Sequence, residues 1–441
     1  MVREAHRNER RRRSGVVIVV LGLATLGLQI GTAPASAVNL VRNFSSDGKV
    51  VSDFGDEFEA AEGMAAQPGG GFVVAGTAYA QDSAVRSHIL LVSYKRNGKL
   101  DRAFGDEGVV VTTVATRTKA EAVAVQPDGK LVVAGSAKEP DDDSDVVLAR
   151  YNPDGSLDPS FGSGGVVIGD FVQSAGAARH HIPASVDYAL DAAIQADGRI
   201  VVAGAVDNGA ALIRYLPNGA PDESFGVDGV VRLVAGFDPF QAVEALPDGR
   251  LLAGGGTSSG ATLLVRYLPN GAPDPSFSAD GIVGMPFSPC AIARDIAVDA
   301  QGRVVVAGSV GGCGELPPNA TLARYSPDGE LDPTFSGDGL LELSDTNASS
   351  LGFALENGTK PILAATAYGF LPREDDFLIA RFRSDGKRDR SFSDGRVTTD
   401  FNRRRDAART ALIIGRRLVV VGQTVHAGNT ALAVACYRLD R

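Results

Sequence analysis

The chain has 441 residues, including 53 Gly and 22 Pro, whereas aromatic residues make up only 6% and Trp is absent. This composition is typical of short strands joined by many tight turns and argues against long helices, so we expect an all-β protein. The formal net charge of −10 repels the phosphate backbone of nucleic acids and anionic lipid head groups, which excludes both as partners.

The first 37 residues differ in character from the rest of the chain. Arg10–Arg13 precede an apolar run from Val16 to Leu28, and Ala35-Ser36-Ala37 forms a small-residue cleavage site. This pattern predicts a secretory signal peptide and a secreted mature chain that starts near Val38. Its removal takes the net charge from −10 to −14, because residues 1–37 hold six Arg and two Glu. The alternative is an uncleaved membrane anchor, since Val16–Ala33 is nearly long enough to span a bilayer. The cleavage site favours the signal peptide, and no later segment is long and apolar enough to span a membrane.

A pair of apolar runs around a tight turn recurs along the rest of the chain. In the clearest copy, Gln126-Pro127-Asp128-Gly129 is followed by a β-branched run from Leu131 to Gly135. Two apolar runs around Asp-Gly predict a β-hairpin, because Gly supplies the positive φ that such a turn needs. The turn glycines recur every 51 to 69 residues, at positions 70, 129, 198, 249, 302, 358 and 415.

Each hairpin is followed by a third run, which ends in Arg-Tyr or a related pair such as Arg150-Tyr151. A second Asp-Gly or Asn-Gly turn and an Asp, here Asp158, lead into a fourth run that contains Phe161. Four strands of this length match the size of a propeller blade. The aromatic residues recur in every unit, so we expect them to fill the space between neighbouring sheets.

The two ends of the chain complement each other. The seventh unit stops after Leu439 without its fourth run, and Asn43–Val51 is a fourth-run motif with no unit before it. This offset predicts that the N-terminal strand pairs into the C-terminal blade and closes a ring. We therefore expect residues 38–441 to form a single domain, a seven-bladed β-propeller of four-stranded antiparallel blades.

The repeated elements resemble the delta-60 repeat of secreted bacterial proteins. The resemblance lies in Gln126–Lys130, Ala149–Asp158 and Ser160–Gly162, and it extends over about residues 43 to 441. It is weakest at residues 349–366 and 409–422. The resemblance implies a β-propeller and supplies no catalytic residues, because the function of the family is largely undefined.

One repeated element, Asn152–Asp158, superficially resembles the calcium loops of integrin-type propellers. Calcium requires 6 to 8 oxygen ligands, and Arg150 stands where a further acidic ligand would be expected. We therefore expect an Arg150–Asp158 pair that holds the turn, with equivalents in most units. A calcium site is not favoured, and we predict no cofactor.

Function is expected where the units differ from one another. Glu62, Glu121, Asp191 and Asp295 stand eight or seven residues before the turn glycines, where we expect the innermost strands to start. In a ring they converge at the channel mouth, as an acidic collar for a cation, an amine or a polyhydroxyl ligand. The alternative is a solvated rim with no ligand.

The variable loops on the same face hold further candidates. The acidic tips Glu139–Asp143 and Glu374–Asp376 and the pair His180-His181 have ligand chemistry, but we favour solvated loops. Cys290 and Cys313 are expected on one face of the fifth unit and are candidates for a disulfide. Cys436 is expected to be a free, buried thiol.

These features predict a secreted, monomeric binding or scaffold module that takes a protein or glycan ligand at its variable loops and channel mouth. The first alternative is a channel-mouth hydrolase or lyase that uses His, carboxylates and a metal, since propellers host such chemistry. The chain offers it no nucleophile motif such as Gly-x-Ser-x-Gly. The second alternative is a purely structural cell-envelope protein.

Overall fold

The structure is a computed structural model. It describes residues 17–19 and 40–439, with gaps at 55–57, 81–85, 140–143, 172–185, 234–236, 258–259, 286–289, 312–317, 345–347, 369–374 and 402–404. Nearly all regular structure in these ranges is β-strand, and a short 3-10 helix spans Ser393–Gly395. No helix among the described residues is long and apolar enough to cross a membrane.

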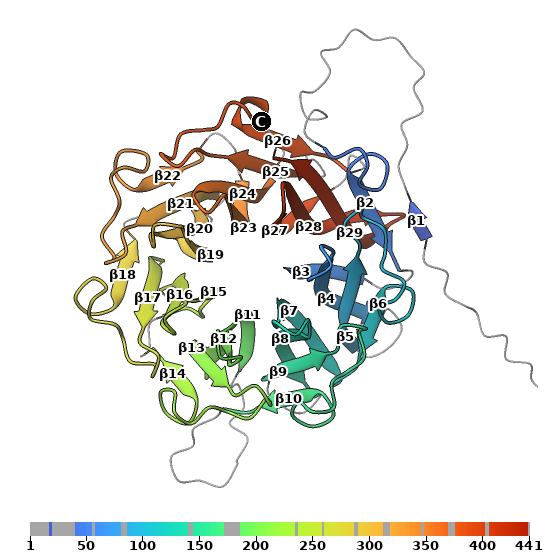
Figure 1. Ribbon diagram of the computed structural model, residues 1–441, viewed down its shortest axis with the longest axis horizontal. Coiled ribbons are helices and arrows are strands. Elements are labelled where there is room, and N and C mark those ends of the chain that lie inside the picture. Colours follow the sequence, from blue (N-terminus) through green and yellow to red (C-terminus); the bar gives the residue numbers. More distant parts are fainter. Residues whose placement is uncertain are drawn as a thin grey trace, which may run out of the picture.

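The strands form antiparallel units that lie around a common centre (Figure 1). Unit I contains β3 (Phe58–Ala66), β4 (Phe72–Ala80), β5 (Arg86–Tyr94) and β6 (Val109–Thr112). Unit II contains β7 (Arg117–Val125), β8 (Leu131–Lys138), β9 (Ser144–Tyr151) and β10 (Val166–Gly169). A parallel bridge between β5 and β7 joins these two units into one eight-stranded sheet.

Units III to VI are separate four-stranded sheets. Unit III contains β11 (Tyr188–Ile194), β12 (Ile200–Val206), β13 (Gly209–Tyr215) and β14 (Val230–Arg232). Unit IV contains β15 (Ala242–Ala245), β16 (Leu251–Gly256), β17 (Thr262–Tyr267) and β18 (Ile282–Met285). Unit V contains β19 (Ile292–Val298), β20 (Val304–Val310), β21 (Asn319–Tyr325) and β22 (Leu340–Glu342). Unit VI contains β23 (Ala348–Glu356), β24 (Lys360–Ala367), β25 (Asp376–Arg381) and β26 (Arg396–Thr399).

The last unit combines the two ends of the chain. Unit VII contains β27 (Ala407–Ile414), β28 (Arg417–His426) and β29 (Asn429–Arg438), and its sheet continues with β2 (Lys49–Asp53) and β1 (Val17–Val19). Strand β2 pairs antiparallel with β29, with Val50 opposite Val434. Just before it, the Val41 N–H donates to the Cys436 carbonyl at 2.9 Å. Residues 1–16 and 20–39, which include most of the predicted signal peptide, lie outside the described residues.

The first strand of each unit lies nearest the centre (Figure 1). Each of these innermost strands contacts the next one around the centre, and β27 contacts β3. The predicted hairpin turns are present: Gly129 has a φ of 85°, and its N–H donates to the Gln126 carbonyl at 2.9 Å. The described residues thus confirm an all-β chain with the antiparallel sheets of a β-propeller.

The hydrophobic core is divided among the junctions between neighbouring units. One cluster combines Val132 and Leu148 of unit II with Val202 and Ile213 of unit III. The aromatic residues that recur in the sequence are buried in these junctions, as predicted. They include Tyr94, Tyr151, Tyr215, Tyr267, Tyr325 and Tyr437, together with Phe104, Phe161, Phe225, Phe277 and Phe335.

An arginine at the end of the third strand joins each of units II to VI to the unit that follows. In the first copy, Arg150 Nε donates to Asp158 Oδ2 at 2.8 Å, and Nη1 donates to the Pro217 carbonyl of unit III. Its Nη2 donates to Ser160 Oγ at 3.0 Å, and the guanidinium carbon lies 4.6 Å from the centroid of the Phe161 ring. We call this set of contacts the arginine clamp. In the other copies Arg214, Arg266, Arg324 and Arg381 reach the carbonyls of Pro269, Pro327, Ser384 and Leu439.

The first clamp is buried, and all three nitrogens of its Arg150 guanidinium are paired. Arg150 is 6% exposed and Asp158 is 4% exposed, so each would be costly to leave without a partner. Burial by itself raises the pKa of Asp158. The hydrogen bonds from Ser160 and Lys130 and the charge of Arg150 outweigh burial, so this pKa lies below its usual range. The predicted Arg150–Asp158 contact is therefore present, and the bond to the next unit adds a function that the sequence did not indicate.

Two of the three cysteines lie in the described residues. Cys290 is part of a disulfide, and its predicted partner Cys313 lies outside the described residues. Cys436 is free and buried, as expected, and burial raises the pKa of its thiol to about 12.

The clamp gives a prediction for stability. Replacing Arg214 by Ala removes one guanidinium from a buried pair and from the carbonyl of the next unit, so we expect a loss of about 3 kcal/mol in the free energy of unfolding. Urea denaturation measures this change.

The control is Arg102→Ala, which breaks the exposed Arg102–Glu107 pair on unit I and should cost less than about 1 kcal/mol. Equal losses in the two variants would contradict a special role for the clamp.

Candidate functional site

The innermost strands of units I, II, III, V, VI and VII carry a β-bulge at corresponding positions. In β3 the pairing register shifts between Ala61 and Gly63, so Glu62 is the extra residue, and Glu121 has the same place in β7. Bulges redirect side chains and often occur beside functional sites. The extra residues of the remaining bulges are Leu190, Arg294, Leu351 and Arg409.

A cavity of about 280 Å³ lies among these bulges, and we call it the central cavity. Its polar and charged lining residues are Glu62, Glu121, Asp191, Gln241, Arg294, Asp295, Arg409 and Thr410. The structure thus brings together all four acidic residues that the sequence singled out.

The position and composition of this site differ from the expected acidic collar. Glu62 is the fifth of nine residues in β3, and Asp295 is the fourth of seven in β19. The acids therefore lie midway along their strands, not at the strand starts that would form the channel mouth. Two arginines share the cavity with them, so its lining carries both signs of charge.

Glu62 and Glu121 stand on the adjacent innermost strands β3 and β7. Burial raises the pKa of Glu62, although the charges of Arg409 and Lys119 oppose the shift. Burial and the charge of Glu62 raise the pKa of Glu121 to about 7. The protonated form of Glu121 is therefore favoured more than in an exposed glutamate, and this form can both donate and accept a hydrogen bond.

Asp191 and Asp295 have a structural role that the expected collar did not include. Asp191 Oδ2 accepts from the Val243 N–H of unit IV at 2.8 Å, and Asp295 Oδ2 accepts from the Phe353 N–H of unit VI at 2.9 Å. Each Oδ1 accepts from the N–H of the following residue at 2.8 Å. These carboxylates therefore link neighbouring units, which leaves Glu62 and Glu121 as the acids better placed to meet a ligand.

The same two aspartates are costly to ionise. Burial raises the pKa of Asp191 to about 6, although its hydrogen bonds from backbone N–H groups oppose the shift. Burial raises the pKa of Asp295 to about 8, with a further contribution from the charge of Asp191.

Arg294 and Arg409 are the residues that sequence reasoning missed. Arg294 Nη1 donates to Gln241 Oε1 at 2.8 Å, and Arg409 Nε lies 3.8 Å from Glu62 Oε2, which is too long for a hydrogen bond. The Nε atoms of both arginines are buried and have no hydrogen-bond partner within the described part of the chain. A signal was available, because Arg294, like Glu62 and Glu121, stands eight residues before its turn glycine.

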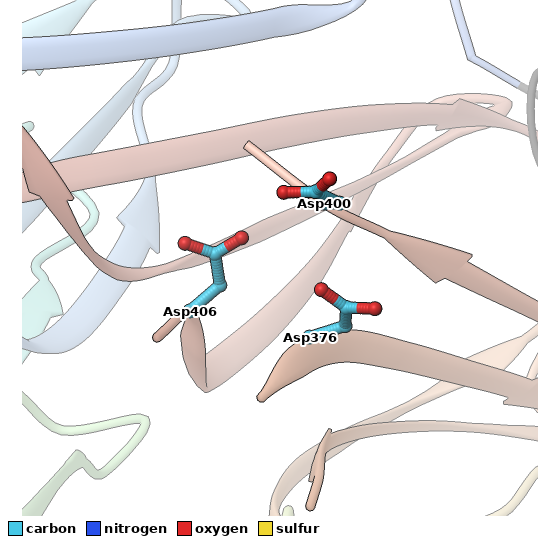
Figure 2. A group of neighbouring side chains, drawn as sticks. All are labelled: Asp376, Asp400 and Asp406. Carbon is cyan, nitrogen blue, oxygen red and sulfur yellow. The ribbon is translucent and has the colours of Figure 1, made fainter. Parts of the chain in front are cut away.

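A second acidic group lies between units VI and VII, where Asp376, Asp400 and Asp406 each place one carboxylate oxygen within 4.8 Å of the others (Figure 2). Asp406 accepts from the Phe401 N–H at 2.7 Å and from Thr424 Oγ1 at 2.5 Å, so it fastens the loop that enters unit VII. Asp187 likewise accepts from the Phe171 N–H at 3.1 Å, which joins the end of unit II to the start of unit III. The chain thus uses Asp406 structurally, in a role that it repeats elsewhere.

Most other candidates fall on loops outside the described residues. These are His180-His181, residues 141–143 and Glu374. His88 is described, and its Nδ1 lies 2.9 Å from Thr113 Oγ1, a contact between β5 and the chain after β6.

Comparison with known proteins supports the fold. Residues 126–161, 195–225, 246–277 and 302–335 match the family model described as a domain of unknown function (DUF5122) beta-propeller. No match was found among the curated proteins.

Solved structures with a similar chain course include two enzymes. The PQQ-bound aldose sugar dehydrogenase of Streptomyces coelicolor has a TM-score of 0.40 and 16% identity over 71% of this chain and 93% of its own. The α-L-arabinofuranosidase of Fusarium graminearum, in complex with arabinobiose, has a TM-score of 0.43 and 9% identity over 92% of this chain and 97% of its own. Similarity at this level carries no argument about what this chain binds.

The buried aspartates give a prediction for the pH dependence of stability. A carboxyl has a pKa near ~4 in the unfolded chain, whereas Asp295 titrates at about 8 in the folded protein. Between these values the folded state binds more protons than the unfolded state, so the stability from Asp295 is complete below about pH 4 and is lost as the pH rises towards 8.

Asp295→Asn should therefore flatten the decline of the free energy of unfolding from pH 4 to 8, measured by urea denaturation. The exposed Asp228→Asn is the control and should keep the wild-type profile. An unchanged profile in Asp295→Asn would show that this carboxyl ionises freely in the folded protein.

Proposed function

We propose that this chain, four segments of which match a β-propeller family model, is a secreted binding module for a small ligand. The ligand carries a carboxylate together with hydroxyl or ammonium groups, and it binds in the central cavity. We further propose that the mature domain starts near Val38 and is a closed, seven-bladed propeller.

Two contacts between units I and VII support closure. Tyr94 of unit I exchanges a hydrogen bond with Ser52 of β2 at 2.8 Å. Inside the chain, Tyr151 of unit II bonds in the same way to Thr112 of unit I at 2.9 Å. Arg417 of unit VII donates to the Arg96 carbonyl of unit I at 3.1 Å, and this carbonyl has the position that the arginine clamp uses in other units. These contacts, which resemble those between consecutive units, support the proposed closure.

The observation that carries the ligand proposal is the pair of buried Nε atoms of Arg294 and Arg409, which have no hydrogen-bond partner within the described residues. A buried donor of this kind is costly unless a ligand or water satisfies it. Guanidinium groups bind carboxylates through paired hydrogen bonds. A ligand carboxylate in the cavity that reaches these Nε atoms would therefore satisfy them.

The acidic part of the lining selects hydrogen-bond donors. Glu62 and Glu121 accept from hydroxyl or ammonium groups, and the raised pKa of Glu121 allows it to act as a donor as well. The cavity of about 280 Å³ is slightly smaller than the ~300–1,000 Å³ typical of ligand pockets. It therefore suits a single acidic sugar or an amino acid better than a protein segment.

Calorimetric titration of the mature chain with glucuronate, glucose and a panel of amino acids tests the proposal. We expect saturable binding of glucuronate or of an amino acid and none of glucose, which lacks the carboxylate. Arg294→Gln and Arg409→Gln should each weaken binding by about tenfold or more, the range for a charge-assisted hydrogen bond. Arg102→Gln, on the surface, should leave binding unchanged.

Two results would overturn the carboxylate assignment. One is binding of glucose as tight as that of glucuronate, and the other is binding that persists in both arginine variants. Conversion of a bound ligand would instead favour the hydrolase or lyase alternative, and absence of any saturable ligand would favour a structural protein.

Closure has its own test, because β2 supplies the outer strand of unit VII. A chain that starts at Val38 should unfold with the stability of the intact domain, whereas a chain that starts after Asp53 should lose several kcal/mol or fail to fold. A synthetic peptide of residues 38–53 should restore the lost stability of the shorter chain, measured as its thermal midpoint. Equal midpoints for the two chains without peptide would contradict a closed ring.

A further inference from the structure

The junction between units I and II lacks the arginine clamp, although the backbone there has the same form. Ser93 stands opposite Val73 in the β4–β5 pair, as Arg150 stands opposite Val132 in the β8–β9 pair. The Asp101 N–H donates to the Ser93 carbonyl at 2.8 Å, and the Asp158 N–H donates to the Arg150 carbonyl at 2.9 Å. The backbone frame is therefore preserved, but Ser93 replaces the arginine, and its Oγ donates to Gln67 Oε1 at 3.0 Å.

A second cation is also missing from this junction. In unit II, Lys130 Nζ lies 3.0 Å from Asp158 Oδ2, and in unit III Arg199 Nε lies 2.8 Å from Asp222 Oδ2. The corresponding residue of unit I is Gly71, whose carbonyl accepts from Gln67 N–H as that of Lys130 accepts from Gln126 N–H. The aspartate of unit I has thus lost both of the cations that surround its equivalents.

That aspartate, Asp101, is left more open and less fully paired. Its side chain is 35% exposed, against 6% for Asp158. Its ion pair is with Lys95 Nζ at 3.4 Å, and the Lys95 side chain is 56% exposed. Such exposed pairs contribute little and are easily exchanged.

The missing side chains leave a cavity of about 720 Å³ between the two units. Asp101 and Lys95 line it from unit I, and Pro153, which corresponds to the clamp acceptor Pro217, lines it from unit II. Phe104 lies against Gly155 of unit II, as the stacking ring Phe161 lies against Gly219 of unit III. The carboxylate and the proline of the clamp thus line the cavity, and the ring lies at the same junction next to Gly155.

The charges on the rim allow such a group to enter. Asp101 and Asp128 are matched by Lys95 and Arg96 among the lining residues. The Arg96 guanidinium extends towards unit VII, where its Nη2 lies 3.5 Å from the position that a Cβ on Gly415 would take. Its charge is thus directed away from unit II.

We propose that this cavity is a second binding site, separate from the central cavity, for the guanidinium group of an arginine side chain presented by a ligand. In each of the five arginine clamps of this chain, an Asp, a backbone carbonyl and a Phe ring together hold a guanidinium group. In unit I the clamp position holds Ser93, which pairs with the cavity residue Gln67, so this strand supplies no arginine to the site.

The test is calorimetric titration of the mature chain with capped arginine, capped lysine and capped citrulline, each with an acetylated N-terminus and an amidated C-terminus. Capped arginine should bind saturably, and capped citrulline, a neutral analogue of similar shape, should not. Capped lysine should bind at least about tenfold more weakly, because an ammonium lacks the planar fork of the guanidinium. Absence of saturable arginine binding, or equal binding of citrulline, would overturn the proposal.

Two variants assign the binding to this cavity. Ser93→Arg should abolish arginine binding and raise the thermal midpoint, because the new side chain forms the missing clamp. Asp101→Asn should weaken binding by about tenfold or more, whereas Glu107→Gln, which neutralises an exposed acid on the same unit, should not.

Arginine binding that is unchanged in a folded Ser93→Arg chain would place the ligand elsewhere and contradict the proposal. If Ser93→Arg does not fold, Asp101→Asn against Glu107→Gln decides the question. Ser93 and Asp101 do not line the central cavity. A negative result for arginine binding therefore leaves the proposal for the central cavity unaffected.

Discussion

Buried guanidinium groups connect consecutive units of this propeller, and the rest of the structure depends on that connection. Each clamp arginine pairs with an aspartate of its own unit and donates to a backbone carbonyl of the next one. Arginine suits this place because it remains charged and offers five donors in a planar fork, so one side chain satisfies partners on two units. The stacking on Phe161 and its equivalents adds a cation–π contact on the apolar side.

The clamp is missing at the third strands of unit I and unit VII, whose innermost strands contact each other. Unit I has Ser93 and unit VII has Cys436 in place of the arginine. At the junction from VII to I, Arg417 and β2 supply other bonds. At the junction from I to II no equivalent cation is supplied within the described residues, and a cavity remains. The cavity between units I and II thus lies where unit I lacks the clamp arginine that units II to VI contain.

Much of the fold could be predicted from the sequence because it depends on local signals. Turns such as Pro127-Asp128-Gly129 set the hairpins, and the unmatched run at Asn43–Val51 indicated the strand that pairs with β29. The central site could be predicted only in part. The positions of Glu62 and Glu121 were recognised by their spacing, but the bulges that aim them are a property of strand pairing, which spacing does not reveal.

Tertiary contacts account for what the sequence did not reveal. Asp191 and Asp295 have the same residue type and spacing as a ligand would require, yet their carboxylates are occupied by N–H groups of the next unit. Arg294 and Arg409 occupy the bulge position that Glu62 and Glu121 occupy in other units. They were overlooked because a position that holds an acid in some units and a base in others does not resemble a repeated motif. The cross-unit bond of Arg150 to Pro217 joins residues far apart in the sequence, so no local pattern indicates it.

The central claim is that the clamp couples each unit to the next. Hydrogen–deuterium exchange of Arg214→Ala measures this coupling directly, with Arg102→Ala as the comparison. The account predicts faster exchange both in β13, which carries Arg214, and in the Leu268–Ala272 turn of unit IV, whose Pro269 carbonyl loses its donor. Faster exchange confined to unit III, with the turn of unit IV as protected as in the wild type, would contradict it.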